Sequence, residues 1–281
     1  MEREREAATE RLVQRYVARG ETEYYDLKYS TAAEWYQKAS NLRPDDAIFL
    51  NRIGFLYFHA GDYIVATNFF KRALSIYEQT LGTMHPDTLT ILSNLAQLYC
   101  TQGFYDQSEL LYKQGLAICE QVLGALHPDT AGSLNGLGAL YYRQGLYEKA
   151  KPLYLRALTI RKQLLGEMHP ETATSINNLA VLYEAEGLYD KSELLCKQAL
   201  IIREQLHGVF HPATATSINN LGVLRNLQDR CREAETLLQQ AYEIRVAILG
   251  ASHPDAQESA ESLHYVRKQI IIMEDTDKSR L

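Results

Sequence analysis

The amino-acid sequence lacks the features that mark membrane, secreted and nucleic-acid-binding proteins. No apolar run approaches the roughly 18 residues of a membrane-spanning helix. Residues 2–6 alternate acidic and basic side chains without an apolar segment, which excludes a secretory signal there. Nonspecific binding to nucleic acid needs a clustered basic surface, and the net charge of -6 argues against it. Neither a membrane nor a nucleic acid is therefore an expected partner.

Cysteine is also scarce. None of the four cysteines stands in a Cys-x-x-Cys spacing: Cys100, Cys119, Cys196 and Cys231. A disulfide framework or a zinc site is not expected, and a reducing cytoplasm fits this pattern best. Apolar residues make up 46% of the chain and charged residues 23%, the usual balance of a folded protein. The length of 281 residues suffices for two ordinary domains or for one elongated array.

A repeat of 42 residues organises the chain. The dipeptide His-Pro recurs at this spacing, beginning at His85, His127, His169, His211 and His253. Leu-Gly precedes it in four copies, and His207-Gly208 replaces it in the remaining one. Glycine adopts a left-handed conformation easily, and proline suits the first turn of a helix. Each junction is therefore expected to end one helix and begin the next.

Between the junctions, apolar residues recur with helical spacing. The first half of each repeat has two large apolar columns: Leu50, Leu92, Leu134, Ile176 and Ile218, then Ile53, Leu95, Leu137, Leu179 and Leu221. In the second half, small residues alternate with a column of larger ones: Phe70, Tyr112, Tyr154, Cys196 and Leu238. Spacings of three and four place such side chains on one helical face. Each repeat is therefore predicted to be a packed pair, helix A followed by helix B.

The spacing is typical of tetratricopeptide repeats, in which large-x-x-Leu-Gly-x-x-Tyr is followed by Ala-x-x-x-Phe. One copy runs from Leu50 through Gly54 and Tyr57 to Phe70. The sequence predicts an all-α fold, a right-handed superhelical solenoid of helix-turn-helix repeats forming a single domain over residues 1–273. The expected parts are a short repeat near 13–46, five 42-residue repeats near 47–256 and a capping helix near 257–273. Residues 274–281 are expected to form a disordered tail.

The 42-residue unit resembles the repeats of kinesin light chains over roughly residues 44–256. The resemblance is carried by residues 194–204 and by the stretch 211–222, which contains Asn219-Asn220-Leu221-Gly222. It implies a groove, lined by helix A, that binds cargo peptides, with asparagines of the Asn-Asn-Leu-Ala motif contacting the peptide backbone. Light chains also carry a long heptad coiled coil for the motor heavy chain, and residues 1–28 are too short for one. Many bacterial signalling proteins carry similar arrays.

The candidate peptide-binding residues lie on helix A, beside the apolar columns. An amide presents a donor and an acceptor together, so Asn94, Asn178 and Asn220 could pair with a peptide backbone. Alternatively, these amides bond neighbouring helices and hold the array together. The same candidate surface includes Asn51, Arg52, Phe55, Gln97, Asn135, Arg143, Thr174, Val181, Thr216 and Val223.

Three residues on or near this surface leave alternatives open. Phe55 either receives an apolar side chain of a ligand or packs on the preceding helix. Arg143 and Arg225 are either partners for an acidic peptide or merely solvated.

No catalytic or metal-binding constellation is expected. One histidine per repeat at a helix start separates neighbours by roughly 10 Å or more, whereas zinc needs nitrogens at about 2 Å. The histidine column is therefore predicted to structure the loops. Cys196 occupies a core position, where a thiol is usually inert. Gly136-Leu137-Gly138 is part of helix A and not a dinucleotide-binding turn, because no strand precedes it. The sequence predicts neither an enzyme nor a cofactor.

The leading functional hypothesis is a protein-interaction scaffold or adaptor, resembling kinesin light chains, that binds a peptide segment of a partner in a concave groove. The alternative is a regulatory or sensor module of a larger signalling or transcription-regulating protein. Self-association of the array is a third possibility.

Overall fold

The computed structural model describes the backbone of residues 2–280 and the side chains of residues 3–275. The described residues form helices joined by short connections and contain no β-strand, so the predicted all-α fold is confirmed. The chain divides into two compact units, Met1–Leu140 and Tyr141–Leu281, called unit 1 and unit 2. None of the described helices is long and apolar enough to cross a lipid bilayer.

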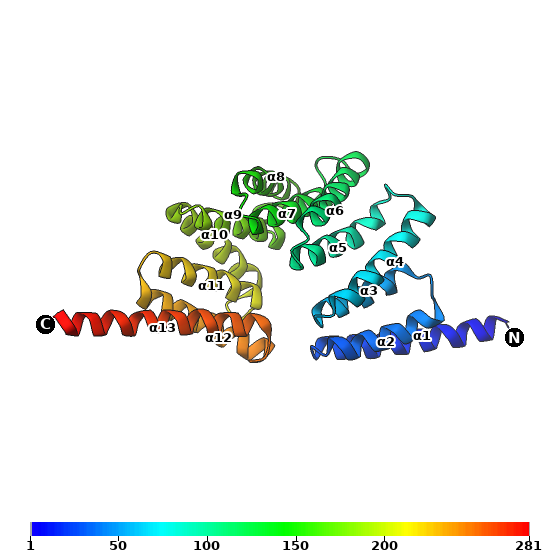
Figure 1. The fold of residues 1–281 in the computed structure, drawn as a ribbon, viewed down its shortest axis with the longest axis horizontal. Helices are drawn as coiled ribbons and strands as arrows, with labels where there is room; N and C mark the ends of the chain where they lie inside the picture. The colour runs from blue at the N-terminus through cyan, green and yellow to red at the C-terminus, as the bar shows by residue number, and fades with distance from the viewer. Residues whose placement is uncertain (1, 281) are drawn as a thin grey trace. The chain divides into compact units, whose positions relative to one another are not determined.

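Unit 1 consists of consecutive helix pairs, coloured blue to green in Figure 1. Helix α1 pairs with α2, α3 with α4, and α5 with α6. A short 3-10 helix precedes α5, and a π-helical turn extends α6. The bounds are α1 (Glu2–Tyr25), α2 (Tyr29–Leu42), α3 (Ala47–His59), α4 (Tyr63–Leu81), η1 (Pro86–Thr88), α5 (Leu89–Thr101), α6 (Tyr105–Ile118) and η2 (Cys119–Leu123).

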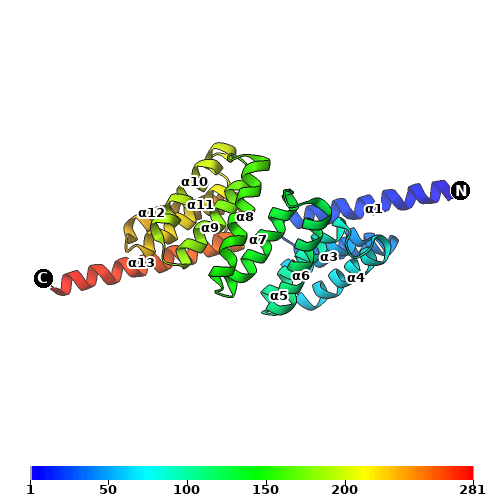
Figure 2. The ribbon, with the colours of Figure 1, turned by 90° about the horizontal axis from the view of Figure 1, so that it is seen from above.

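Unit 2 continues the same pairing from green to red, which Figure 2 shows from above. Helix α9 packs against α10, α11 against α12, and α13 covers α12. The bounds are α7 (Pro128–Arg143), which spans the division, α8 (Tyr147–Leu165), α9 (Pro170–Ala185), α10 (Tyr189–His207), α11 (Pro212–Leu227), α12 (Cys231–Leu249) and α13 (Pro254–Arg280). Helix α13 thus continues beyond the expected capping helix at 257–273 and through residues 274–280. The final residue of the predicted disordered tail lies outside the described residues. The boundaries of the predicted repeats stay a prediction.

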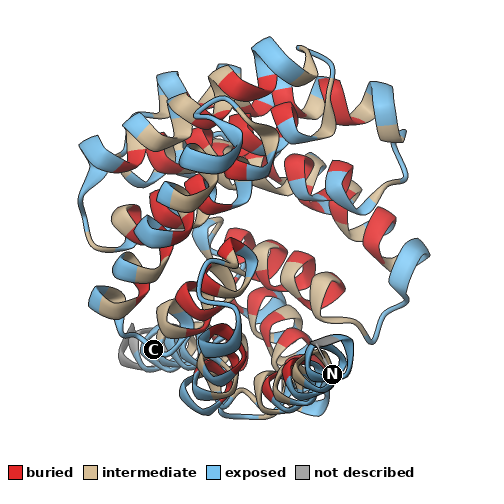
Figure 3. Cartoon of the chain, turned by 90° about the vertical axis from the view of Figure 1, so that its right-hand side faces the viewer, coloured by how far each residue is buried: buried red, intermediate tan, exposed pale blue. Residues whose placement is uncertain are grey.

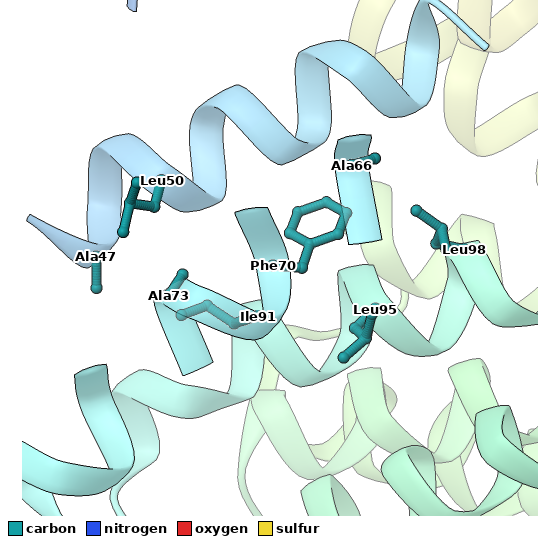
Figure 4. Close-up of a cluster of buried hydrophobic side chains, with 8 residues drawn as sticks. All are labelled: Ala47, Leu50, Ala66, Phe70, Ala73, Ile91, Leu95 and Leu98. Carbon is teal, nitrogen blue, oxygen red and sulfur yellow. The ribbon is translucent and has the colours of Figure 1, made fainter. Parts of the chain in front are cut away.

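The core lies between the paired helices, where the buried faces meet in Figure 3. In unit 1 the ring of Phe70 is fully buried among Ala66, Leu95 and Leu98, as Figure 4 shows. A Cβ atom at Gly54 would lie 2.7 Å from this ring, so the small residue there is required for the close approach. Both apolar columns of helix A that the sequence predicts are buried throughout: Leu50, Leu92, Leu134, Ile176 and Ile218, then Ile53, Leu95, Leu137, Leu179 and Leu221.

The His-Pro junctions form helix caps. The Nδ1 atom of His85 accepts a hydrogen bond of 3.2 Å from the backbone N–H of Asp87, which a helix start leaves without an intrahelical partner. The same bond, donated by the backbone N–H two residues later, is accepted by Nδ1 of the other histidines of the column: His127, His169, His211 and His253. The preceding Gly82 has a φ of 94°, which ends helix B in the left-handed region. The predicted loop-structuring role of the histidine column is confirmed.

Three buried arginines connect each helix B of unit 2 to the start of the next helix A. The Nη1 atom of Arg203, on α10, donates to the carbonyl oxygen of Ala213 at 3.1 Å and to Ser217 Oγ at 2.9 Å. Arg161 and Arg245 make the equivalent pair of bonds one repeat earlier and one repeat later. We call Arg161, Arg203 and Arg245 the arginine braces. Burial lowers the pKa of Arg203.

Candidate functional site

A groove of about 730 Å³ opens in unit 1 across the N-terminal ends of α3, α5 and α7. Its floor and walls come from consecutive A helices, with η1 and one side chain of α4 between them. We call this surface the unit-1 groove. The residues that line it are Ala47, Ile48, Asn51, Tyr77, Pro86, Asp87, Leu89, Thr90, Ile91, Ser93, Asn94, Asp129, Gly132 and Ser133.

An amide pair crosses the groove. The Nδ2 atom of Asn94 on α5 donates to Oδ1 of Asn51 on α3 at 3.0 Å. In unit 2, Asn220 donates to Asn177 in the same way at 2.8 Å. For Asn94 and Asn220 the structure therefore shows the helix-bridging bond that was one of the two expected roles. Each bond uses one of the two amide N–H groups, and contact with a peptide stays a prediction.

The charged side chains in the groove are acidic. Asp87 lies at the start of η1 and Asp129 at the start of α7, and their side chains are 61% and 60% exposed. Each carboxylate lies 3.7 Å from Nδ1 of the capping histidine two residues earlier. That nitrogen accepts a backbone N–H bond. Since no lysine or arginine is among the described lining residues, the groove favours a cationic ligand group.

Apolar and phenolic surfaces complete the groove. Ile48 is 67% exposed at the start of α3, far more than the core residues beside it. The phenol of Tyr77 on α4 lies in the wall. Its pKa is raised, first by burial and then by the carboxylates of Asp87 and Asp46, so the hydroxyl stays a hydrogen-bond donor at neutral pH. The groove therefore offers an apolar contact, amides and negative charge together.

Arg52 and Phe55 lie outside the unit-1 groove, in an aromatic cluster against α1. The guanidinium of Arg52 lies 4.4 Å from the ring centroid of Tyr24 and is bonded to Glu21 at 2.9 and 3.1 Å. The ring centroid of Phe55 lies 6.3 Å from that of Tyr24 and 4.3 Å from that of His59. Of the two roles expected for Phe55, packing on a preceding helix is the one that the structure shows.

The remaining candidate residues are dispersed. Asn135 is buried, and Gln97, Arg143 and Thr174 are exposed outside the lining of the groove. In unit 2, Thr216 accepts a hydrogen bond from Arg245. Val223 packs beside the buried cluster of α12 and α13. Asn178 and Val181 are half-buried and lie on α9. Of the predicted set, only Asn51 and Asn94 line the groove.

Arg225 is not available to an acidic ligand. Its side chain is 6% exposed and makes two bonds to the carboxylate of Glu193, at 2.5 and 2.7 Å. This ion pair holds the pKa of Glu193 well below its usual range, and Lys197 adds to the effect. Arg225 therefore joins α11 to α10 and is not a charge for a partner.

The described residues contain no group of three or more histidine, cysteine, aspartate or glutamate side chains placed to hold a metal ion. The rings of His207 and His211 stack with centroids 4.3 Å apart. Stacked rings do not direct two nitrogens at one ion. All four cysteines are buried, and burial raises the pKa of Cys196 to about 11, so that its thiol is inert at neutral pH.

Sequence reasoning missed part of the groove. The candidate binding residues chosen from the sequence did not include Asp87, Asp129, Tyr77 or Ser133. A change of residue type at one repeated position of helix B could have indicated them. Arginine stands at 161, 203 and 245, but Tyr77 and Cys119 stand at the equivalent positions of unit 1.

The comparison with family models agrees with the repeat. The model described as Tetratricopeptide repeat matches overlapping stretches at residues 45–121, 89–163, 129–193 and 171–245. These stretches together span most of both units. A search of curated protein sequences finds no match.

Solved structures with the same fold include kinesin light chain-like repeats. BtubC (BKLC) from P. vanneervenii has a TM-score of 0.62 and 26% identity, covering 86% of this chain and 94% of that one. Nearly identical TPR-like repeats of a Podosopora anserina protein described as a kinesin light chain have a TM-score of 0.60 and 24% identity, covering 73% and 96%. A Rap protein complexed with Competence and Sporulation Factor has a TM-score of 0.63 and 17% identity, covering 96% and 79%.

Proposed function

Because the chain belongs to the tetratricopeptide repeat family, we propose that it is a protein-interaction module that binds an extended peptide segment of a partner in the unit-1 groove. The observation that carries this proposal is the groove itself, which crosses three A helices and has an exposed apolar side chain beside an amide pair. Stacked repeats offer such extended surfaces, and peptide recognition commonly combines backbone hydrogen bonds with side-chain pockets.

The role is that of a scaffold or adaptor and not of an enzyme. The carboxylates of Asp87 and Asp129 lie at helix starts beside capping histidines, without a nucleophile held by a base. The proposed partner is a protein segment in the cytoplasm, and neither nucleic acid nor a membrane is proposed as a ligand. The solved Rap complex, which has this fold, supports ligand binding by such arrays in general.

The test begins with selection of binding peptides from a random displayed library, using the whole chain as the target. Affinities are then measured by calorimetry for the wild type, Ile48→Asp and the matched control Ile64→Asp. Both isoleucines are strongly exposed, at 67% and 76%, but only Ile48 lines the groove. Both variants should therefore fold.

We expect Ile48→Asp to weaken binding at least about tenfold, since a buried apolar contact of about 1.5 kcal/mol or more is lost. Ile64→Asp should bind as the wild type does. Equal affinities for all three proteins, or a selection that yields no binder, would overturn the proposal. The alternative, a regulatory or sensor module of a larger signalling or transcription-regulating protein, would use the same groove and differs in what this chain itself is joined to.

A further inference from the structure

We propose that the unit-1 groove contains a seat for a guanidinium group, which an arginine side chain of the bound segment fills. The proposal rests on the peptide binding proposed above and names the side chain that the groove recognises. It comes from a difference between equivalent positions of the two units.

Unit 2 shows how the repeat holds a guanidinium. Arg245 Nη1 donates to the carbonyl oxygen of Asp255 at 2.8 Å and to Ser259 Oγ at 2.7 Å. Its Nη2 donates to Thr216 Oγ1 at 3.2 Å, on the preceding helix A. The acceptors are thus a threonine of one helix A and a carbonyl and a serine at the start of the next.

The equivalent residues line the unit-1 groove. Three repeats before Thr216, Asp255 and Ser259 stand Thr90, Asp129 and Ser133, and all three belong to the lining. The residue equivalent to Arg245 is Cys119, whose Sγ reaches Ser133 Oγ at 3.3 Å. A cysteine carries no cation, so unit 1 has the acceptors of a brace without its arginine. We call Thr90, the carbonyl oxygen of Asp129 and Ser133 the guanidinium seat.

The charge around the seat suits an arginine. In unit 2 the carboxylate of Glu171 lies 3.3 Å from Arg161 Nε. Asp129 occupies the equivalent position in unit 1 and lines the groove, and Asp87 adds a second carboxylate one repeat earlier. A planar guanidinium with five donors can serve several separated acceptors at once, which the compact ammonium of lysine does less well. The seat should therefore prefer arginine to lysine.

The direct test uses N-acetyl-arginine-N-methylamide as the probe and follows the backbone amide signals of the full chain by NMR. We expect saturable shifts at Ser133, which belongs to the seat, and at Gly132 beside it. The citrulline analogue has the same shape without the charge, and we expect it to bind about tenfold or more weakly, because charge-assisted bonds are lost. The lysine analogue should fall between the two.

Variants at Cys119 then separate the seat from the rest of the groove. Cys119→Arg supplies the missing side chain from within, so the probe should bind at least about tenfold more weakly while the melting temperature stays equal or rises. Cys119→Ala is the matched control, because it alters the same position without filling the seat, and it should bind the probe as the wild type does. If Cys119→Arg does not fold, Ser133→Ala takes its place and should weaken binding by about tenfold.

Equal binding of the arginine and citrulline probes would overturn the seat, as would undiminished binding to a folded Cys119→Arg protein. Shifts that cluster away from residues 87–133 would overturn it as well. If library-selected peptides without arginine bind in an Ile48-dependent manner and Cys119→Arg leaves them unaffected, the seat fails while the proposed function stands. If the arginine probe binds but no peptide does, the proposed function fails and the seat stands.

Discussion

Helix B of each repeat in unit 2 carries an arginine directly after its last buried isoleucine, whereas Tyr77 and Cys119 stand at the equivalent positions of α4 and at the end of α6 in unit 1. The braced helices α8, α10 and α12 continue as α-helix to the closing glycine. In unit 1, α6 changes at Cys119 into the π-helical turn η2, and α5 begins after the 3-10 turn η1. The braced and unbraced junctions thus differ in helical geometry as well as in side chains.

The two units share a fold but differ in their surfaces. The apolar columns are the same in both units, so packing of helix A on helix B does not depend on the brace. The residues equivalent to those that accept bonds from Arg245 are Thr90, Asp129 and Ser133 in unit 1, and they line a groove. In the proposal above, a ligand in unit 1 supplies the guanidinium that an internal arginine supplies in unit 2.

The largest expected effect comes from breaking a brace. Arg203→Met keeps the length of the side chain but removes the bonds to the carbonyl oxygen of Ala213 and to Ser217 Oγ. We expect a loss of about 2–4 kcal/mol in the free energy of unfolding, since these are charge-assisted bonds in a buried site. Urea denaturation measures the loss, and hydrogen exchange should show faster opening at the start of α11.

The matched control is Tyr77→Phe, at the equivalent position of unit 1. It should change stability by less than about 1 kcal/mol because it removes only a hydroxyl group. If Arg203→Met is as stable as the wild type, the brace does not hold α10 to the start of α11.

A pH dependence should distinguish the units next. Burial raises the pKa of Glu184 to about 7 from 4.5, and unit 1 has Phe58 and Cys100 at the equivalent positions. The folded state therefore binds a proton that the unfolded state releases. The contribution of the protonated Glu184 to the stability of the folded state is complete below pH 4.5 and is lost as the pH rises through 7.

Glu184→Gln removes this dependence. We expect the variant to be more stable than the wild type by about 1–2 kcal/mol at pH 8, a value reduced for the solvent contact that the side chain keeps. Chemical denaturation at a series of pH values measures it. Glu193 has the opposite sign, because Arg225 depresses its pKa and the ion pair is lost as the pH falls. Identical pH profiles for wild type and Glu184→Gln would show that Glu184 is solvated.

The amide pairs should behave alike in both units. Asn94→Ala and Asn220→Ala each remove one bond between consecutive A helices. We expect each to cost about 1 kcal/mol, offset slightly by the better helix propensity of alanine. Thermal denaturation measures both. A variant that loses ligand affinity without losing stability would instead favour the peptide-contact role of that asparagine.

The smallest expected effect concerns the turn between helix A and helix B. Asp229 has a φ of 59°, in the left-handed region, whereas Gly61 and Gly103 occupy the equivalent turns of unit 1. Asp229→Gly should raise stability by about 0.5–1 kcal/mol, since glycine adopts this conformation without steric cost. Gly103→Asp is the reciprocal change and should lower stability. No change in either variant would show that these turns are not strained.

Periodicity in the sequence was sufficient to predict the helix pairs and their buried columns. Leu50 and Ile53 were placed in the core correctly because packing forces a regular spacing on apolar residues. The histidine caps were also predictable, since His-Pro repeats in register with the helix ends.

The groove was less predictable. An arginine such as Arg203 is normally interpreted as a surface residue, so its buried role was missed. The site residues were expected along both units because the asparagine motif recurs in both. Where a groove opens depends on side chains that face each other across helices, such as Tyr77 and Asp87, and spacing does not report those contacts.

Peptide binding in the unit-1 groove is tested most directly by an NMR map of a library-selected peptide on the full chain. Thr90 in unit 1 and Thr174 in unit 2 occupy equivalent positions two repeats apart, but only Thr90 lines the groove. We expect the shifted amide signals to fall within residues 47–133, around Thr90. Shifts centred on Thr174 and the neighbouring residues of α9 and α11 would contradict it.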